Sequence, residues 1–126
     1  MIKTVTVNIW GREFALPIEY DCYKGEVITK EQISAVENFI SHNEYIEKAK
    51  INVELFCKEK VMADDENERK DNIFSYIMPD YLFIKRDDNY PRVAIMCKYR
   101  YDQEHGVAVV FSHDGKTTVG LQDIIL

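Results

Sequence analysis

One short stretch between two apolar runs places Asp102, Glu104 and His105 within four positions of one another. Carboxylate oxygens and an imidazole nitrogen are common metal ligands, and the same groups can transfer protons. Residues so close in a chain rarely all reach one ion, so a metal site would need ligands from elsewhere. The nearest candidates in the same half of the chain are His113, Asp114 and Asp123.

The same stretch also has the composition of a hairpin loop. Five residues separate Tyr101 from Val107, Gly106 suits a positive φ angle, and Asp102 can accept hydrogen bonds from backbone amides. A turn accounts for Asp102 and Gly106 but leaves Glu104 and His105 unexplained. A metal-binding protein or metal-dependent enzyme that uses Asp102, Glu104 and His105 is therefore the alternative hypothesis.

A second group of residues suggests binding rather than chemistry. Basic side chains and tyrosines are interspersed over residues 81–101 of an otherwise acidic chain. Arginine and aromatic residues are enriched at protein interfaces, although solvated charges and core tyrosines give the same pattern. We expect a protein partner, or a second copy of the chain, to contact Arg92, Lys98, Tyr99, Arg100 and Tyr101.

Motifs for covalent catalysis are missing from the sequence. It contains neither a Gly-x-Ser-x-Gly elbow nor a glycine-rich phosphate loop. Cys22, Cys57 and Cys97 form no Cys-x-x-Cys pair, which indicates three reduced thiols, and Cys97 is expected to be inert on the apolar side of a strand. We predict no catalytic residue and no cofactor, and the leading hypothesis is a non-enzymatic interaction module.

Composition limits the class of protein. The 126 residues suit a single domain over 1–126, and a 46% apolar content suits a folded core. The net charge of −6 disfavours binding to nucleic acid. No apolar run is long enough to span a membrane, and the alternating N-terminus does not resemble a signal peptide, so a cytoplasmic location is expected.

Periodicity predicts the elements of the first half. Alternation over 3–9 and 12–19 predicts two strands of a hairpin that turns at Gly11, and Pro17 favours a strand end or an edge position. Thr29 and Gln32 form a capping box before a helix over 30–41, and a second helix follows over 44–62. The charged run 64–72 is expected to be a solvated loop.

The second half is expected to be mostly β. A short helical turn over 73–78 should end at Pro79, before strands over 81–85, 92–101, 107–112 and 117–121 and a packed C-terminal tripeptide. The order predicts an α+β fold, an antiparallel sheet made of an N-terminal hairpin and a C-terminal meander, with two consecutive helices packed on one face. Both faces of 92–101 carry apolar residues, which is typical of a central strand or of a face that meets another subunit.

Four stretches resemble a known family. They are Trp10–Phe14, Tyr81–Arg86, Tyr99–Phe111 and Gln122–Leu126. They resemble a family of small bacterial proteins known only as a domain of unknown function. The resemblance implies a bacterial cytosolic protein of one domain. At the level of fold, such proteins are similar to immunity or accessory proteins of toxin systems.

Overall fold

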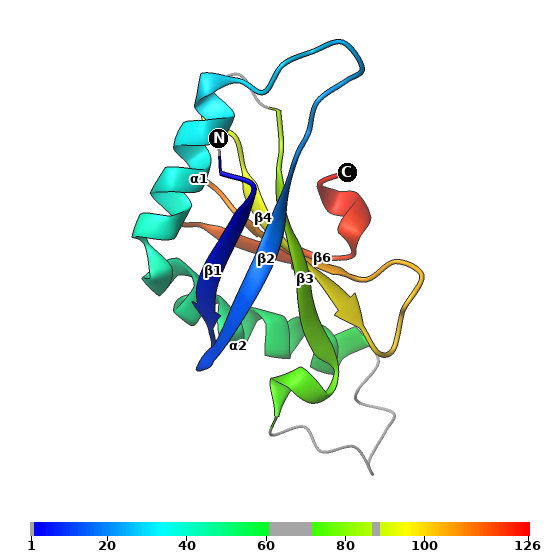
Figure 1. The fold of residues 1–126 in the computed structure, drawn as a ribbon. Coiled ribbons are helices and arrows are strands. Elements are labelled where there is room, and N and C mark those ends of the chain that lie inside the picture. Colours follow the sequence, from blue (N-terminus) through cyan, green and yellow to red (C-terminus); the bar gives the residue numbers. More distant parts are fainter. Residues whose placement is uncertain (1, 61–71, 87–88) are drawn as a thin grey trace.

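A six-stranded sheet with two helices on one face makes up the fold of the computed structural model, which describes residues 2–60, 72–86 and 89–126 (Figure 1). The strands lie in the sheet in their order along the chain. In chain order the elements are β1 (Thr4–Ile9), β2 (Arg12–Tyr20), α1 (Lys30–Ser41), α2 (Asn43–Lys60), η2 (Ile73–Ser75), β3 (Ile77–Ile84), β4 (Val93–Tyr99), β5 (Val107–Phe111), β6 (Thr117–Gly120) and η3 (Gln122–Ile124).

The predicted α+β class is confirmed, and so are the N-terminal hairpin and the meander from β3 to β6. One junction differs, because β2 pairs with β3 in parallel while every other described pair is antiparallel. The helices α1 and α2 fill the connection between β2 and β3, as a parallel crossover requires. The charged run lies outside the described residues except for Asn72, whose side chain caps η2.

The turn between β1 and β2 attaches the hairpin to α2. Trp10 and Gly11 occupy a two-residue turn with φ angles of 50° and 87°, the positive values that such hairpin turns need. Trp10 tolerates this backbone because its indole is buried and its Nε1 donates a 2.8 Å hydrogen bond to the Ile46 carbonyl of α2. The hairpin is therefore fixed to the helix through its own turn.

The start of α1 joins three segments of the chain. The predicted capping box is present: Thr29 Oγ1 accepts from the Gln32 amide at 3.1 Å, and Gln32 Oε1 accepts from the Thr29 amide at 2.9 Å. Gln32 is fully buried, and its Nε2 donates to the Asp21 carbonyl at 2.9 Å and the Ile84 carbonyl at 3.2 Å. One side chain thus connects the helix to the ends of β2 and β3.

β2 and β3 separate over most of their length. Their parallel pairing covers only Ile18–Tyr20 against Leu82–Ile84. Pro17 and Pro79, which have no backbone N–H to donate, both lie in the separated halves. Pro79 was expected to end a helical turn; it lies instead inside β3, next to a register irregularity.

The aromatic side chain of η2 packs beside the separated half of β2. Phe74 lies with its ring centroid 5.5 Å from that of Phe14 in β2 and 6.1 Å from that of Trp10. The Arg12 guanidinium lies 5.4 Å from the centroids of both phenylalanine rings. These contacts hold η2 against β2 where backbone pairing to β3 has ended.

The two faces of β4 are both buried, but by different partners. Val93, Ile95, Cys97 and Tyr99 belong to the core beneath the helices. The opposite face forms a second cluster whose members are Phe83, Ala94, Met96, Ala108, Val110 and Ile125. The C-terminal segment therefore covers this face, so its apolar character requires no second subunit (Figure 1).

The expected packing of the C-terminal tripeptide is only partly right. Ile125 is 1% exposed, whereas Ile124 is 41% and Leu126 is 63% exposed. Gly120 lets this segment approach the sheet, because a Cβ there would lie 2.9 Å from a methyl group of Ile124. Among the described residues, no helix has the length and apolarity that crossing a membrane demands.

We predict that Gln32→Met destabilises the protein by about 1–3 kcal/mol, since the thioether fills a similar volume but leaves the Asp21 and Ile84 carbonyls without this donor. Urea unfolding followed by Trp10 fluorescence measures the change. The same substitution at exposed Gln103 is the control and should change stability by less than about 0.5 kcal/mol. Equal effects at the two positions would contradict the role given to Gln32.

Candidate functional site

A groove opens where β3 leaves β2. It has a volume of about 560 Å³ and lies between the start of β3 and the end of β4. We call it the basic groove; its lining residues are Phe74, Ser75, Tyr76, Ile77, Met78, Lys98, Tyr99, Arg100 and Gln103. Lys98 and Arg100 are exposed at this end of β4. The groove combines apolar walls with two cationic side chains.

Strand register explains which side chains meet at the groove. Met78 of β3 lies directly opposite Lys98 of β4, so the two side chains project from the same face of the sheet. Met78 is 36% exposed, which is unusual for a large apolar side chain in a central strand. The Arg100 guanidinium lies 5.9 Å from the ring centroid of Tyr101.

The five predicted contact residues do not form one surface. Lys98 and Arg100 lie at the basic groove, but Tyr99 is 1% exposed because alternation turns it toward the helices. Tyr101 is half-buried and packs edge-on against Tyr99, with ring centroids 5.7 Å apart. Arg92 lies at the other end of β4, in a small pocket with Val110 and Lys116 among its lining residues. Of the predicted contacts, the structure brings Lys98, Tyr99 and Arg100 together at the groove.

Two more basic residues of the stretch 81–101 lie at another corner of the molecule. Lys85 Nζ lies 3.7 Å from Asp21 Oδ2, and Arg86 Nη2 lies 3.5 Å from Glu26 Oε2. Arg86 Nη1 also donates a 2.7 Å hydrogen bond to the Val27 carbonyl. These two cations are therefore used to hold the loop between β2 and α1.

The thiols beneath the helices are poor nucleophiles. Cys57 and Cys97 are both fully buried. Burial raises the pKa of Cys57 to about 11. Burial also raises the pKa of Cys97, and the nearby Cys57 adds to the effect. A thiol with so high a pKa holds its proton near neutral pH, as expected for Cys97 from its place in the strand.

The stretch from Asp102 to Gly106 forms a closed turn. His105 Nδ1 lies 3.0 Å from Asp102 Oδ1, and the same oxygen accepts a 3.2 Å hydrogen bond from the His105 amide. Gly106 has a φ of 60°, and a Cβ on it would lie 2.7 Å from the Cys97 carbonyl. Glu104 is exposed, and in the described residues no three His, Cys, Asp or Glu side chains are placed to hold a metal ion.

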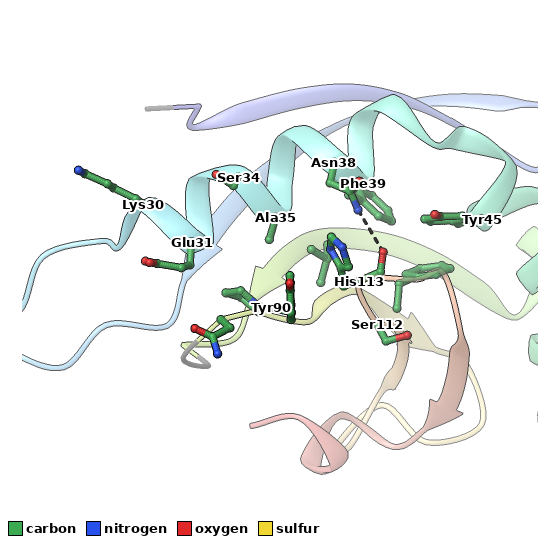
Figure 2. Close-up of a pocket in the computed structure, with 14 residues that line it drawn as sticks. Lys30, Glu31, Ser34, Ala35, Asn38, Phe39, Tyr45, Tyr90, Ser112 and His113 are labelled. Carbon is green, nitrogen blue, oxygen red and sulfur yellow. Dashed lines mark hydrogen bonds between the residues drawn. The ribbon is translucent and has the colours of Figure 1, made fainter.

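A second cavity, which sequence reasoning missed, lies between α1, the loop before β4 and the β5–β6 turn. Figure 2 shows this cleft, of about 220 Å³, with Asn38 donating from Nδ2 to the His113 carbonyl at 3.3 Å. The rings of Tyr90 and His113 lie against each other, with centroids 4.4 Å apart. The residues that line this cleft come from segments far apart in the chain, so no local sequence motif could have indicated the cleft.

The β5–β6 turn closes one side of this cleft by packing against the α1–α2 junction. A Cβ on Gly115 would lie 2.5 Å from the ring of Tyr45, so only glycine allows this approach. Tyr45 in turn stacks on His42 at 4.8 Å, and His42 Nδ1 lies 2.8 Å from the Asn38 carbonyl. The cleft has room for one group of side-chain size against a floor that includes Phe39 and Phe111.

We predict that Asp102→Asn lowers the pKa of His105 toward its ordinary value of 6.5, because the Asp102 carboxylate raises it by hydrogen bonding and charge. The reciprocal shift lowers the pKa of Asp102 below 3.8. The pair therefore contributes most fully to stability at pH values between 3.8 and 6.5, the ordinary pKa values of the two groups. Its contribution is lost as pH falls through the Asp102 pKa or rises through the His105 pKa. An NMR titration of the imidazole measures the shift; Asp114→Asn is the control.

We also expect thermal melting midpoints in Ca²⁺, Mg²⁺, Mn²⁺ or Zn²⁺ to equal the midpoint in chelator, since Asp102 and His105 already bind each other. An ion at a hundred times its dissociation constant would add about 2.7 kcal/mol, or roughly 5–15 °C. A shift of that size with one ion, lost on joint replacement by Glu104→Gln and His105→Asn, would restore the metal hypothesis.

Comparison with known proteins identifies the family but no characterised relative. No curated protein and no solved structure matches the chain. The family whose sequence model matches is described as a domain of unknown function, DUF6985, and the match covers residues 1–126. The resemblance noted from the four sequence stretches is thereby confirmed, and this chain belongs to the DUF6985 family.

Proposed function

We propose that the chain is a non-enzymatic protein-interaction module that binds a segment of a partner protein in the basic groove. One observation carries the proposal: an exposed methionine and an exposed lysine, Met78 and Lys98, lie opposite each other at an apolar groove of about 560 Å³. The local positive charge contrasts with the net charge of −6 of the whole chain. The partner segment is therefore expected to be acidic with an apolar anchor.

The chemistry of the groove supports this kind of partner. Methionine is flexible and polarisable, so it adapts to apolar side chains of different shapes. Lysine and arginine at the margin of an interface increase the association rate for an acidic partner and disfavour a basic one. Phe74, which is half-buried in the groove wall, offers a further apolar surface.

The non-enzymatic part of the proposal is supported by the state of the reactive groups. The two buried thiols have raised pKa values, and His105 is engaged by Asp102. We place the module in the bacterial cytoplasm, in the role of an immunity or accessory protein. Three free cysteines, including the partly accessible Cys22, are typical of a reducing compartment.

Selection of random peptides displayed on phage tests the proposal without a known partner. Peptides selected on the immobilised chain should be rich in Asp and Glu around an apolar residue. We predict that Lys98→Glu weakens binding of a selected peptide at least about tenfold, because it places like charges together. Met78→Ser should weaken it by removing the apolar contact. Fluorescence anisotropy measures both effects, and added salt should reduce the affinity.

Lys48→Glu provides the matched control, because Lys48 is an exposed lysine on α2, away from the groove. Lys48→Glu changes the net charge by the same amount as Lys98→Glu. If the effect of Lys98→Glu is local to the groove, the Lys48 variant should bind the peptide within about twofold of the affinity of the unaltered chain. Selected peptides without acidic residues would overturn the proposal. So would equal losses for the Lys98 and Lys48 variants.

A further inference from the structure

We propose that the free edge of β1 pairs with β1 of a second copy, in an antiparallel arrangement with twofold symmetry. The sheet would then continue through both copies. This surface is separate from the basic groove, which lies between β3 and β4, so the two proposals stand or fall independently.

The register of the hairpin defines which backbone groups face outward. Among the described strands, β1 is the first of the sheet and pairs with β2. Ile18 donates to the Lys3 carbonyl, and the register continues through Val5 opposite Leu16. Because antiparallel hydrogen bonding alternates, the N–H and C=O groups of Thr4, Thr6 and Asn8 point away from β2.

The described residues of β1 carry none of four common devices that prevent edge-to-edge pairing. Natural edge strands are commonly protected by charged side chains, proline, a bulge or a very short length. From Thr4 to Ile9, β1 has six residues without a charge or a proline, and it pairs with β2 in an uninterrupted register. The opposite edge strand is shorter, since β6 has four residues, and both edge strands contact α2.

The spacing of the outward groups makes the edge self-complementary. If Thr6 of one copy faces Thr6 of the other, Thr4 of each copy faces Asn8 of its partner. The three outward residues of each copy can then exchange hydrogen bonds in symmetric pairs. Their side chains are exposed on one face of the sheet, where paired threonines are favourable neighbours. A second copy is therefore the occupant that this edge fits.

The expected association is weak, because a single pair of short strands buries less surface than a stable dimer needs. Each copy also carries a net charge of −6, so added salt should strengthen the association by screening repulsion. Salt should have the opposite effect on peptide binding in the basic groove. The two proposals therefore give distinguishable results on the same protein.

Sedimentation velocity over about 10 µM to 1 mM tests the inference. The unaltered chain should show a dimer fraction that rises with concentration. Thr6→Pro should be monomeric throughout, because proline removes an outward N–H and places its ring in the path of the partner strand. The fold should tolerate this change, since the lost N–H makes no bond to β2. Thr6→Lys, which puts two lysines face to face, should also be monomeric.

Ala15→Lys is the matched control. Ala15 lies opposite Thr6 on β2 and is exposed, so the same charge sits one strand away from the edge. This variant should dimerise like the unaltered chain. In addition, hydrogen exchange of the Thr6 amide should slow as concentration rises. A monomer at every concentration and salt level, or dimers that persist in Thr6→Pro, would overturn the inference.

Discussion

The buried amide of Gln32 is the interaction on which the arrangement of this fold depends. It lies where β2 ends, β3 ends and α1 begins, and it bonds to all three through Asp21, Ile84 and Thr29. The parallel contact between β2 and β3 is only three residues long on each strand. A ladder this short supplies few hydrogen bonds, and the Gln32 side chain adds two where the ladder stops. The Trp10 bond to α2 secures the other end of the hairpin.

The short contact between β2 and β3 also separates the basic residues into two environments. At the closed end, Lys85 and Arg86 are held by Asp21 and Glu26, and the charges serve the loop before α1. At the open end, where β2 has diverged, Lys98 lies at a groove with apolar walls. The same stretch of basic sequence therefore stabilises the fold at one end of the sheet and lines the proposed binding groove at the other.

Features set by neighbouring residues could be predicted from the sequence. The Trp10–Gly11 turn, the Thr29–Gln32 capping box and the alternation along β4 all depend on local spacing, and all three are present. The parallel pairing could not be predicted, because it depends on how both helices return the chain to β2. Pro79 was misjudged for the same reason: proline is acceptable in β3 only because β2 has already moved away.

The candidate sites likewise divide into features that local spacing predicts and features that only the folded chain creates. Alternation was sufficient to place Lys98 and Arg100 on one face and Tyr99 on the other, but the groove itself requires η2, which packs on β2 through Phe74. The Asp102 turn was predicted from five consecutive residues. The cleft beside α1 was not, because its walls come from a helix, a loop and a turn that meet only in the folded chain.

The hydrogen bonds of Gln32 also bear on how the chain reaches its folded state. β1 with β2, and β3 with its successors, are joined by short connections and can form early as separate hairpins. The contacts that unite them bring residues from opposite halves of the chain together, and closing so long a loop costs entropy before any bond is made. Docking of the N-terminal hairpin is therefore expected to be a late step in folding. The buried indole of Trp10 reports directly on that step.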